Sequence, residues 1–143
     1  MIAIDTNILV YAHREDSPWH EKALTCVSDL ANSGSPWAIP WPVAHEFLAV
    51  VTHPRIYDPP TPLATALAAI QAWQASPGLR WIGEGPGYLE KLAALTTAGM
   101  TRGPKIHDGR IAAICVHHRV KKLWSADRDF TSFPELVCEN PLI

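Results

Sequence analysis

Cysteine is scarce in this chain of 143 residues, and the three that occur are widely spaced. Cys26, Cys115 and Cys138 form no Cys-x-x-Cys pair and no finger-like Cys/His spacing, which excludes a zinc finger and a disulfide framework. Their apolar neighbourhoods indicate buried, reduced thiols, as expected for a protein of the cytoplasm.

Long apolar runs are also absent. No stretch reaches membrane-spanning length, and the apolar residues 2–4 run directly into an acid, so we expect neither a membrane span nor a signal peptide. Charged residues make up only 18% of the chain, against a usual quarter. Such a low fraction suggests that a partner covers apolar surface, although a well-filled core would have the same effect.

What is present is enough for one folded unit. With 48% apolar residues in 143, the chain can bury a core unaided, and we expect a single domain over residues 1–143. Strands are predicted at 2–4, 37–39, 80–82 and 123–125, with a possible fifth at 136–138, and helices at 6–13, 18–32, 42–51, 63–73, 88–98 and 106–117. This alternation predicts an α/β fold of three layers (α/β/α), in which helices cover both faces of a central parallel sheet of four to five strands.

Several acids stand where a purely structural role is not the obvious one. Asp5 follows the first strand, Glu46 interrupts an otherwise apolar helix, Asp108 opens the apolar 106–117 helix, and Asp127 and Asp129 follow the fourth strand. Every one of these acids except Glu46 also has an ordinary structural explanation. Glu46 lacks one because its neighbours at helical spacing are mostly apolar. Asp5 could cap a helix, Asp108 could complement a helix dipole, and the last two could form a polar turn.

The predicted sheet would bring these acids together. Asp5 and Asp127 both follow predicted central strands, and the carboxyl ends of parallel strands share one edge of a sheet. Carboxylates that converge there repel one another and require a cation. Oxygen ligands without cysteine or a convincing histidine set favour Mg²⁺, with Mn²⁺ as a substitute, over Zn²⁺.

The residues in order resemble a known family. The strand ending in Asp5-Thr6-Asn7, the helical Glu46, the segment 107–113 (His-Asp-Gly-Arg-Ile-Ala-Ala) and the segment 125–130 (Ser-Ala-Asp-Arg-Asp-Phe) are similar to the PIN domain and, more narrowly, to the VapC toxin ribonucleases of bacterial toxin–antitoxin pairs. The resemblance covers essentially the whole chain. Ser125 is a mild departure, because the family more often has threonine there.

The resemblance implies a metal-dependent endoribonuclease. Asp5 and Asp108 would be the principal ligands of Mg²⁺ or Mn²⁺, Glu46 and Asp127 would complete a catalytic acidic pocket, and Asp129 would have at most a supporting part. Thr6, Asn7 and Ser125 match residues that orient the carboxylates or water. The implied partners are an RNA substrate, a VapB-like antitoxin that neutralises the toxin, and a second copy in a homodimer, all in the cytoplasm.

Half of the basic residues fall in one window of the sequence. They are Arg102, Lys105, Arg110, Arg119, Lys121 and Lys122, six of the twelve lysines and arginines, with Asp108 as the only acid between them. The cluster suggests a surface that holds an RNA backbone, although a solvated helix face would give the same pattern.

Two other functions remain open on the sequence. A strand that ends in Asp-Thr loosely resembles acid-dependent phosphatases of another α/β class, but Asn7 stands where those enzymes need a second acid. A catalytically inactive RNA-binding PIN module is the second alternative, and the presence of every acid of the set argues against it. The alanine- and leucine-rich helix 63–73, with Trp73, is a candidate surface for a protein partner.

Overall fold

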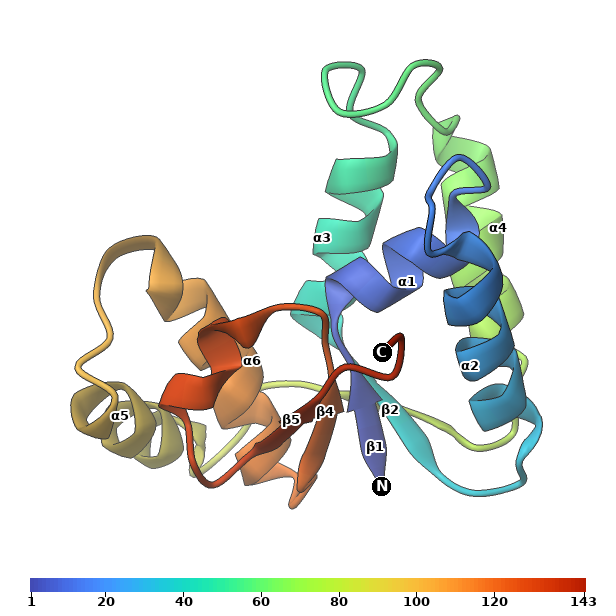
Figure 1. The fold of residues 1–143 in the computed structure, drawn as a ribbon. Coiled ribbons are helices and arrows are strands. Elements are labelled where there is room, and N and C mark those ends of the chain that lie inside the picture. Colours follow the sequence, from blue (N-terminus) through green and yellow to red (C-terminus); the bar gives the residue numbers. More distant parts are fainter.

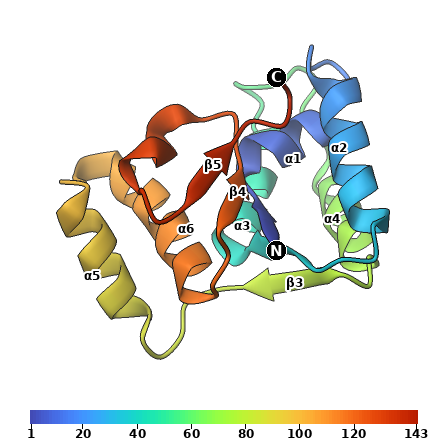
Figure 2. The same ribbon diagram turned by 60° about the horizontal axis from the view of Figure 1, so that its bottom comes forward.

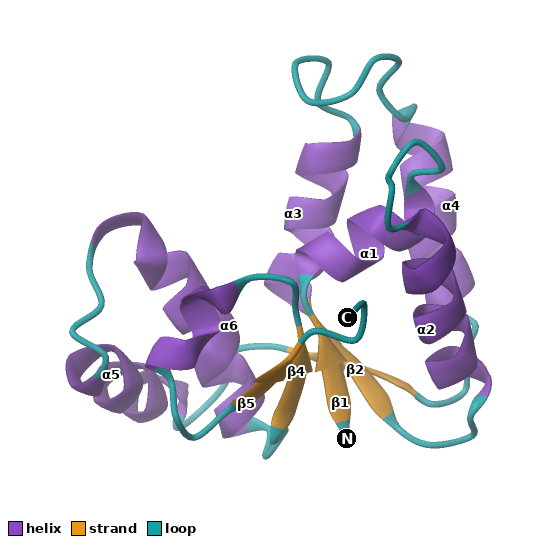
Figure 3. Ribbon diagram, in the orientation of Figure 1, coloured by secondary structure: helices purple, strands orange, loops and turns teal.

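The computed structural model describes residues 1–143 as alternating strands and helices (Figures 1 and 3). The strands are β1 (Ile2–Ile4), β2 (Trp37–Pro40), β3 (Leu79–Ile82), β4 (Lys122–Trp124) and β5 (Val137–Glu139). The helices are α1 (Thr6–His13), α2 (His20–Asn32), α3 (Trp41–Val51), α4 (Leu63–Gln74), α5 (Tyr88–Ala98) and α6 (Ile106–His117), with 3₁₀ turns η1 (Gly103–Lys105) and η2 (Arg128–Ser132).

All five strands are parallel, in the order β3-β2-β1-β4-β5. The chain therefore builds the sheet outward from β1 in one direction, through β2 and β3, and then returns to the other side of β1 with β4 and β5. The order reverses between β1 and β4, where Ile4 is in register with Trp124. In open α/β sheets such a reversal opens a crevice at the carboxyl ends of the strands, because the two connections leave on opposite faces.

The helices form two layers that enclose the sheet. Figures 1 and 2 show α2 and α4 on one side of the sheet and α5 and α6 on the other. This division follows from the strand order, because right-handed crossovers that run in opposite directions along a sheet lie on opposite faces. The predicted three-layer α/β/α architecture with a parallel sheet is confirmed, and the fifth strand is present.

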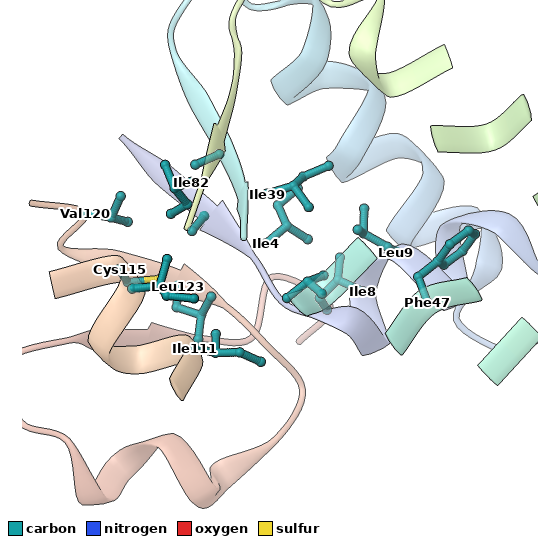
Figure 4. Packing of buried hydrophobic residues seen from close by; sticks show 14 of the residues in the cluster. Ile4, Ile8, Leu9, Ile39, Phe47, Ile82, Ile111, Cys115, Val120 and Leu123 are labelled. Carbon is teal, nitrogen blue, oxygen red and sulfur yellow. The ribbon is translucent and has the colours of Figure 1, made fainter. Parts of the chain in front are cut away.

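Side chains from both layers meet the central strands. Ile8 and Phe47 lie on one side of the strands, and Ile111 and Cys115 lie on the other, all almost fully buried (Figure 4). A strand that is covered on both faces needs apolar residues in succession rather than in alternation. This explains why all four residues of β2 are buried.

The predicted element boundaries hold to within two residues, with small differences that have local causes. The helix predicted from residue 18 begins at His20, because Ser17 to Trp19 form a turn in which the His20 amide donates to the Ser17 carbonyl at 3.1 Å. Of the strand tryptophans, only Trp37 is fully buried. The three cysteines are free, but only Cys115 is fully buried, and Cys26 and Cys138 are partly exposed. None of the helices is both long and apolar enough to cross a membrane.

A glycine allows the closest backbone approach in the fold. Gly78 is buried directly before β3, and a Cβ atom there would lie 2.4 Å from the backbone oxygen of Ser35. The Trp37 amide donates to the Gly78 carbonyl at 3.0 Å, and the Trp37 indole donates to Ser76 Oγ at 3.0 Å. Ser76 in turn donates to the Ala31 carbonyl at 2.7 Å, so this turn joins β2, β3 and α2.

We therefore expect Gly78→Ala to destabilise the protein by about 1–3 kcal/mol, the usual cost of forcing an extra methyl group into a filled space. Gly83→Ala is the matched control, because the nearest atom to its Cβ would be a Trp41 ring carbon at 3.4 Å, an ordinary van der Waals distance. Urea unfolding of both variants measures the difference. Equal stability of the two would contradict the close approach.

Candidate functional site

One hydroxyl joins the ends of the two strands at the reversal point. Ser125, directly after β4, donates to Asp5 Oδ2 at 2.7 Å, and both residues are buried. The same Ser125 oxygen accepts the Asp127 amide at 2.9 Å and the Asn7 side-chain amide at 3.4 Å. Asn7 Oδ1 accepts the Ala126 amide at 3.1 Å. The β1–α1 and β4–η2 connections are thus held together by side chains.

Asp5 occupies the N-cap position of α1 without acting as a cap. Its side chain makes no capping hydrogen bond to the helix, so its burial is not explained by helix capping. Burial raises the pKa of Asp5 from 3.8 to about 6, against the Ser125 hydrogen bond, which lowers it, and nearby Glu46 and Asp108 raise it further. No lysine or arginine compensates this buried carboxylate.

Glu46 reaches the same place from α3. Its Oε2 accepts a hydrogen bond from Thr6 Oγ1 at 3.0 Å. Thr6 begins α1, so the first turn of α1 and the middle of α3 present a hydroxyl and a carboxylate to each other. Thr6 is buried while Glu46 is exposed to solvent, which explains how an acid interrupts an otherwise apolar helix without a large desolvation cost.

Three further acids approach one another beside Asp5. Asp108, in the first turn of α6, offers a carboxylate oxygen within 4.8 Å of oxygens from both Asp127 and Asp129. Burial raises the pKa of Asp108, and the charges of Asp127, Asp129 and Glu46 raise it further, with Lys105 opposing them. The cause of the pKa shift is thus partly the cluster itself.

The two acids after β4 have different surroundings. Asp127 accepts the Asp129 amide at 2.8 Å and so caps η2, which is the polar-turn role, and it also lines the cavity that contains Asp5. Asp129 lies farther out, 3.9 Å from the Lys105 ammonium, and lines a smaller hollow beneath η2 with Asp108. Asp127 therefore shares the central cavity with Asp5, and Asp129 approaches only Asp108 and Asp127.

Besides the smaller hollow beneath η2, the acids line two larger hollows, and Glu46 and Asp108 belong to both of these. The central cavity, of about 260 Å³, is lined by Asp5, Thr6, Asn7, Val10, Tyr11, Glu46, Val50, Tyr57, Asp108 and Asp127. A groove of about 420 Å³ adjoins it between the N-terminal halves of α3 and α6, lined by Pro42, Glu46, Pro104, His107, Asp108, Arg110 and Ile111. An extended polymer lying along this groove would pass the carboxylates of Glu46 and Asp108.

Four residues of the central cavity were not among the predicted site residues. Val10 and Tyr11 follow Asn7 at helical spacing on α1, and Val50 follows Glu46 by one turn on α3, so helical periodicity alone could have found them. Tyr57 comes from the proline-rich segment 53–62, and no sequence signal marks it. Its presence shows that this segment reaches the cavity.

The structure separates the basic window of the sequence into two groups. Arg102 and Lys105 precede α6 and lie at the same end of that helix as Asp108, and Arg110 lines the groove while paired with Glu84. The other three predicted RNA-backbone candidates, Arg119, Lys121 and Lys122, lie after α6 and at the start of β4. They are thus at the opposite edge of the sheet from the acids, because α6 spans about 18 Å, and Lys122 pairs with Glu139 at 2.9 Å.

The donor set suits a hard divalent cation. Every charged group that lines the central cavity is a carboxylate, and no cysteine or histidine lines it. Oxygen donors of this kind match Mg²⁺ or Mn²⁺. Burial first, and the neighbouring carboxylates second, raise the pKa values of Asp5 and Asp108, and a bound cation would oppose both effects by favouring the charged carboxylates.

Fold and site together define a class: an α/β domain with a carboxylate-lined crevice at the reversal point of its parallel sheet. A model of the PIN domain family matches residues 2–136. Ribonuclease VapC48 of Mycobacterium tuberculosis is 33% identical over 138 residues, which are 96% of this chain and 94% of the relative. Ribonuclease VapC25 of the same organism is 35% identical over 143 residues, the full length of both chains. The chain belongs to the PIN domain family and, within it, to the VapC group.

A solved structure has the same fold. The crystal structure of VapBC2 from Rickettsia felis bound to a promoter DNA fragment superimposes with a TM-score of 0.71 over 98% of each chain, at 21% identity. At 21% identity, this superposition shows a shared fold and nothing beyond it.

We expect Ser125→Ala to weaken binding of Mn²⁺ by about 10- to 100-fold, the usual effect of removing a group that orients metal ligands. The substitution removes the hydroxyl shared by Asp5, Asn7 and the Asp127 amide. Titration calorimetry measures the affinity. Ser125→Thr, which keeps the hydroxyl, should retain most of it, and Ser33→Ala, on the distant end of α2, should retain all. Equal affinity in Ser125→Ala and the wild type would contradict the orienting role.

The pKa of Asp5 predicts how stability depends on pH when metal is removed. Between the unfolded value of 3.8 and the folded value of about 6, the folded state binds more protons than the unfolded state. Stability therefore falls as pH rises from about 4 to about 6, by up to about 3 kcal/mol from this group.

Asp5→Asn removes the titrating carboxyl group, so the free energy of unfolding should fall less between about pH 4 and about pH 6. Urea unfolding in EDTA at several pH values measures it for the wild type, for Asp5→Asn, and for Glu135→Gln as an exposed control. Identical pH profiles in the wild type and Asp5→Asn would contradict the pKa shift.

Proposed function

We propose that this chain is a metal-dependent endoribonuclease toxin that hydrolyses phosphodiester bonds in single-stranded RNA. The observation that carries the proposal is the convergence of Asp5, Glu46, Asp108 and Asp127 on one cavity at the reversal point of the sheet. The curated relatives named ribonucleases support it, because they align along nearly the whole chain. The chain would act as a single domain.

The proposed roles follow from position. Asp5 and Asp108 are the cation ligands, since both are partly or fully buried, and burial, with a smaller effect of the neighbouring carboxylates, raises the pKa of each. Glu46 and Asp127 complete the ligand set and orient water, and Asp129 supports Asp108 from outside the cavity. Thr6 fixes Glu46, Ser125 fixes Asp5 and the Asp127 amide, and Asn7 holds Ser125 and the Ala126 amide.

Bound Mg²⁺ or Mn²⁺ would supply Lewis acidity toward the phosphate oxygens and toward water. The side chains supply positioning. The buried hydrogen-bond network holds Asp5 in one orientation before substrate arrives, and fixed groups of this kind need no reorganisation during the reaction. Phosphodiester hydrolysis depends mainly on such in-line positioning and charge compensation.

RNA would lie along the groove that leads from the cavity between α3 and α6. Arg110 lines this groove, and Arg102 and Lys105 stand at the same end of α6, so these three are the proposed contacts to the RNA backbone. Arg119, Lys121 and Lys122 are at the other edge of the sheet, and we do not assign them to the same stretch of RNA.

The proposal includes protein partners. The crystal structure of VapBC2 from Rickettsia felis supports a VapB-like antitoxin as a partner of this chain. The surface of α4 supports a protein contact of some kind, including a homodimer, because only Ala66 of its residues is fully buried while Leu63 and Leu67 are 58% and 40% exposed.

Cleavage of cellular RNA tests the function. Purified wild type with Mg²⁺ or Mn²⁺ should cut RNA at defined sites, and EDTA should abolish the reaction. Asp108→Asn should reduce the rate by about 100-fold or more, the usual scale for losing one charge-stabilising group. Sequencing of the new RNA ends measures both the rate and the sites.

Glu90→Gln, on exposed α5, is the matched carboxylate control and should cleave like the wild type. Full activity in a folded Asp108→Asn protein would overturn the metal-site assignment. RNA binding without cleavage in either metal would favour the inactive module, and a phosphorylated Asp5 would favour the phosphatase. If a small reading frame lies beside this gene, co-expression of its product with this chain tests the antitoxin: a cognate antitoxin should suppress the RNA cleavage.

A further inference from the structure

The central cavity changes character with distance from the sheet. Asn7 and Tyr11 lie one helical turn apart on α1, and Glu46 and Val50 lie one turn apart on α3, and all four line the cavity. One turn advances about 6 Å along each helix axis. The cavity therefore begins with polar and acidic groups at the strand ends and continues, one turn farther along α1 and α3, with Tyr11 and Val50.

Tyr57 lines this outer, apolar part of the cavity. It belongs to the segment between α3 and α4, which stands at the end of α3 away from the sheet (Figure 1). The ring is half-buried, and burial raises the pKa of its hydroxyl. No hydrogen bond of that hydroxyl explains why the ring is held there.

Arg14 holds the ring instead. Its guanidinium lies 4.2 Å from the centroid of the Tyr57 ring, and its side chain is only 11% exposed. The guanidinium donates to the Pro59 carbonyl at 3.0 Å and to Thr61 Oγ1 at 3.1 Å, and it donates twice to Asp16. A planar group with all these partners has one available orientation, so the Tyr57 ring rests on a fixed support.

We infer that Tyr57 is the stacking platform for one nucleobase adjacent to the scissile phosphate, and that Arg14 is the positioning residue that fixes this platform. The inference rests on the proposed ribonuclease function. The acids at the strand ends receive the phosphate, and the base attached to the neighbouring sugar reaches outward to Tyr57, with Val50 and Tyr11 beside it. Aromatic rings accept unstacked bases of single-stranded RNA in this way.

The size of the cavity favours a single nucleotide. Its volume of about 260 Å³ is below the 300–1,000 Å³ typical of sites for larger ligands. A cavity of this size suits one splayed base, as presented by RNA that is unpaired at the cleaved bond. Tyr57 would then contribute affinity for a splayed base, and its neighbours would set which bases are preferred.

A thermodynamic cycle between the protein and the RNA tests the inference. Once a wild-type cleavage site is mapped in cellular RNA, short synthetic RNAs spanning it are prepared, each lacking the base at one position beside the cut. One of these abasic RNAs should be cleaved by the wild type with a kcat/KM about 5- to 150-fold lower, the range for losing one aromatic–base stack.

Tyr57→Leu should lose a similar factor on intact RNA, mainly through KM, and should lose nothing further on that abasic RNA. Tyr57→Phe keeps the ring and should stay within about twofold of the wild type, as judged from the small part a hydroxyl plays in stacking. Tyr88→Leu, at the start of α5 and outside both hollows, is the matched control and should lose activity only on the abasic RNA.

The role of Arg14 as a positioning residue is tested by a single substitution and by a double variant that also lacks the Tyr57 ring. Arg14→Ala should lower kcat/KM by about 2- to 30-fold, the range for losing a cation–π contact. The double variant Arg14→Ala, Tyr57→Leu should cleave no worse than Tyr57→Leu alone. A purely structural role of Arg14 would instead give multiplicative losses and the same sensitivity to abasic RNA as the wild type.

The outcomes separate this inference from the proposed function. If the wild type cleaves RNA but Tyr57→Leu responds to every abasic RNA as the wild type does, the inferred stacking role of Tyr57 is wrong. The proposed ribonuclease function is then unaffected. If the wild type cleaves no RNA with Mg²⁺ or Mn²⁺, the proposed function fails first. Thermal unfolding of each variant confirms that it is folded.

Discussion

The parallel pairing of β1 with β4 determines where everything else in the site lies. Because Ile4 is in register with Trp124, the chain leaves the two strands at the same level, and Asp5 and Ser125 emerge side by side. The 2.7 Å hydrogen bond between them then supplies the donor that a buried carboxylate requires. Asn7 and the Asp127 amide use the same hydroxyl, so one residue of register error would separate all four groups.

This arrangement keeps a carboxylate in a place that does not favour its charge. Asp5 is 6% exposed, and its hydrogen-bond donors are neutral. Domains are stable by only about 5–15 kcal/mol, so a charge that costs about 3 kcal/mol takes a substantial part of that margin. The core on both faces of the sheet offsets the cost. A bound cation would favour the charged form of Asp5, so the same buried carboxylate that lowers the stability of the metal-free fold would provide affinity for the cation.

The central strands, and the placing of Asp5 and Asp127 at one edge, could be predicted from the sequence for one physical reason. The predicted strands 2–4, 37–39 and 123–125 are short and mostly apolar, which is typical of strands covered on both faces, and parallel strands place the residues that follow them at one shared edge of the sheet. Tyr57 was not predictable, because its position depends on Arg14, more than forty residues away in the chain. The basic window shows the opposite case: its residues are near one another in the sequence, but α6 places them at two ends of a helix.

The separation of the basic residues bears on how RNA would be held. With a net charge of −2 and three of six clustered cations remote from the acids, the metal-free crevice is negative and repels a polyanion. Of the nearby cations, Arg110 is already paired with Glu84, and Lys105 stands near Asp129. Arg102, Lys105 and Arg110 are the three proposed contacts to the RNA backbone, so RNA binding would depend only modestly on salt. The rest of the affinity would come from charge compensation at the acids and from uncharged contacts in the aromatic and apolar outer half of the cavity.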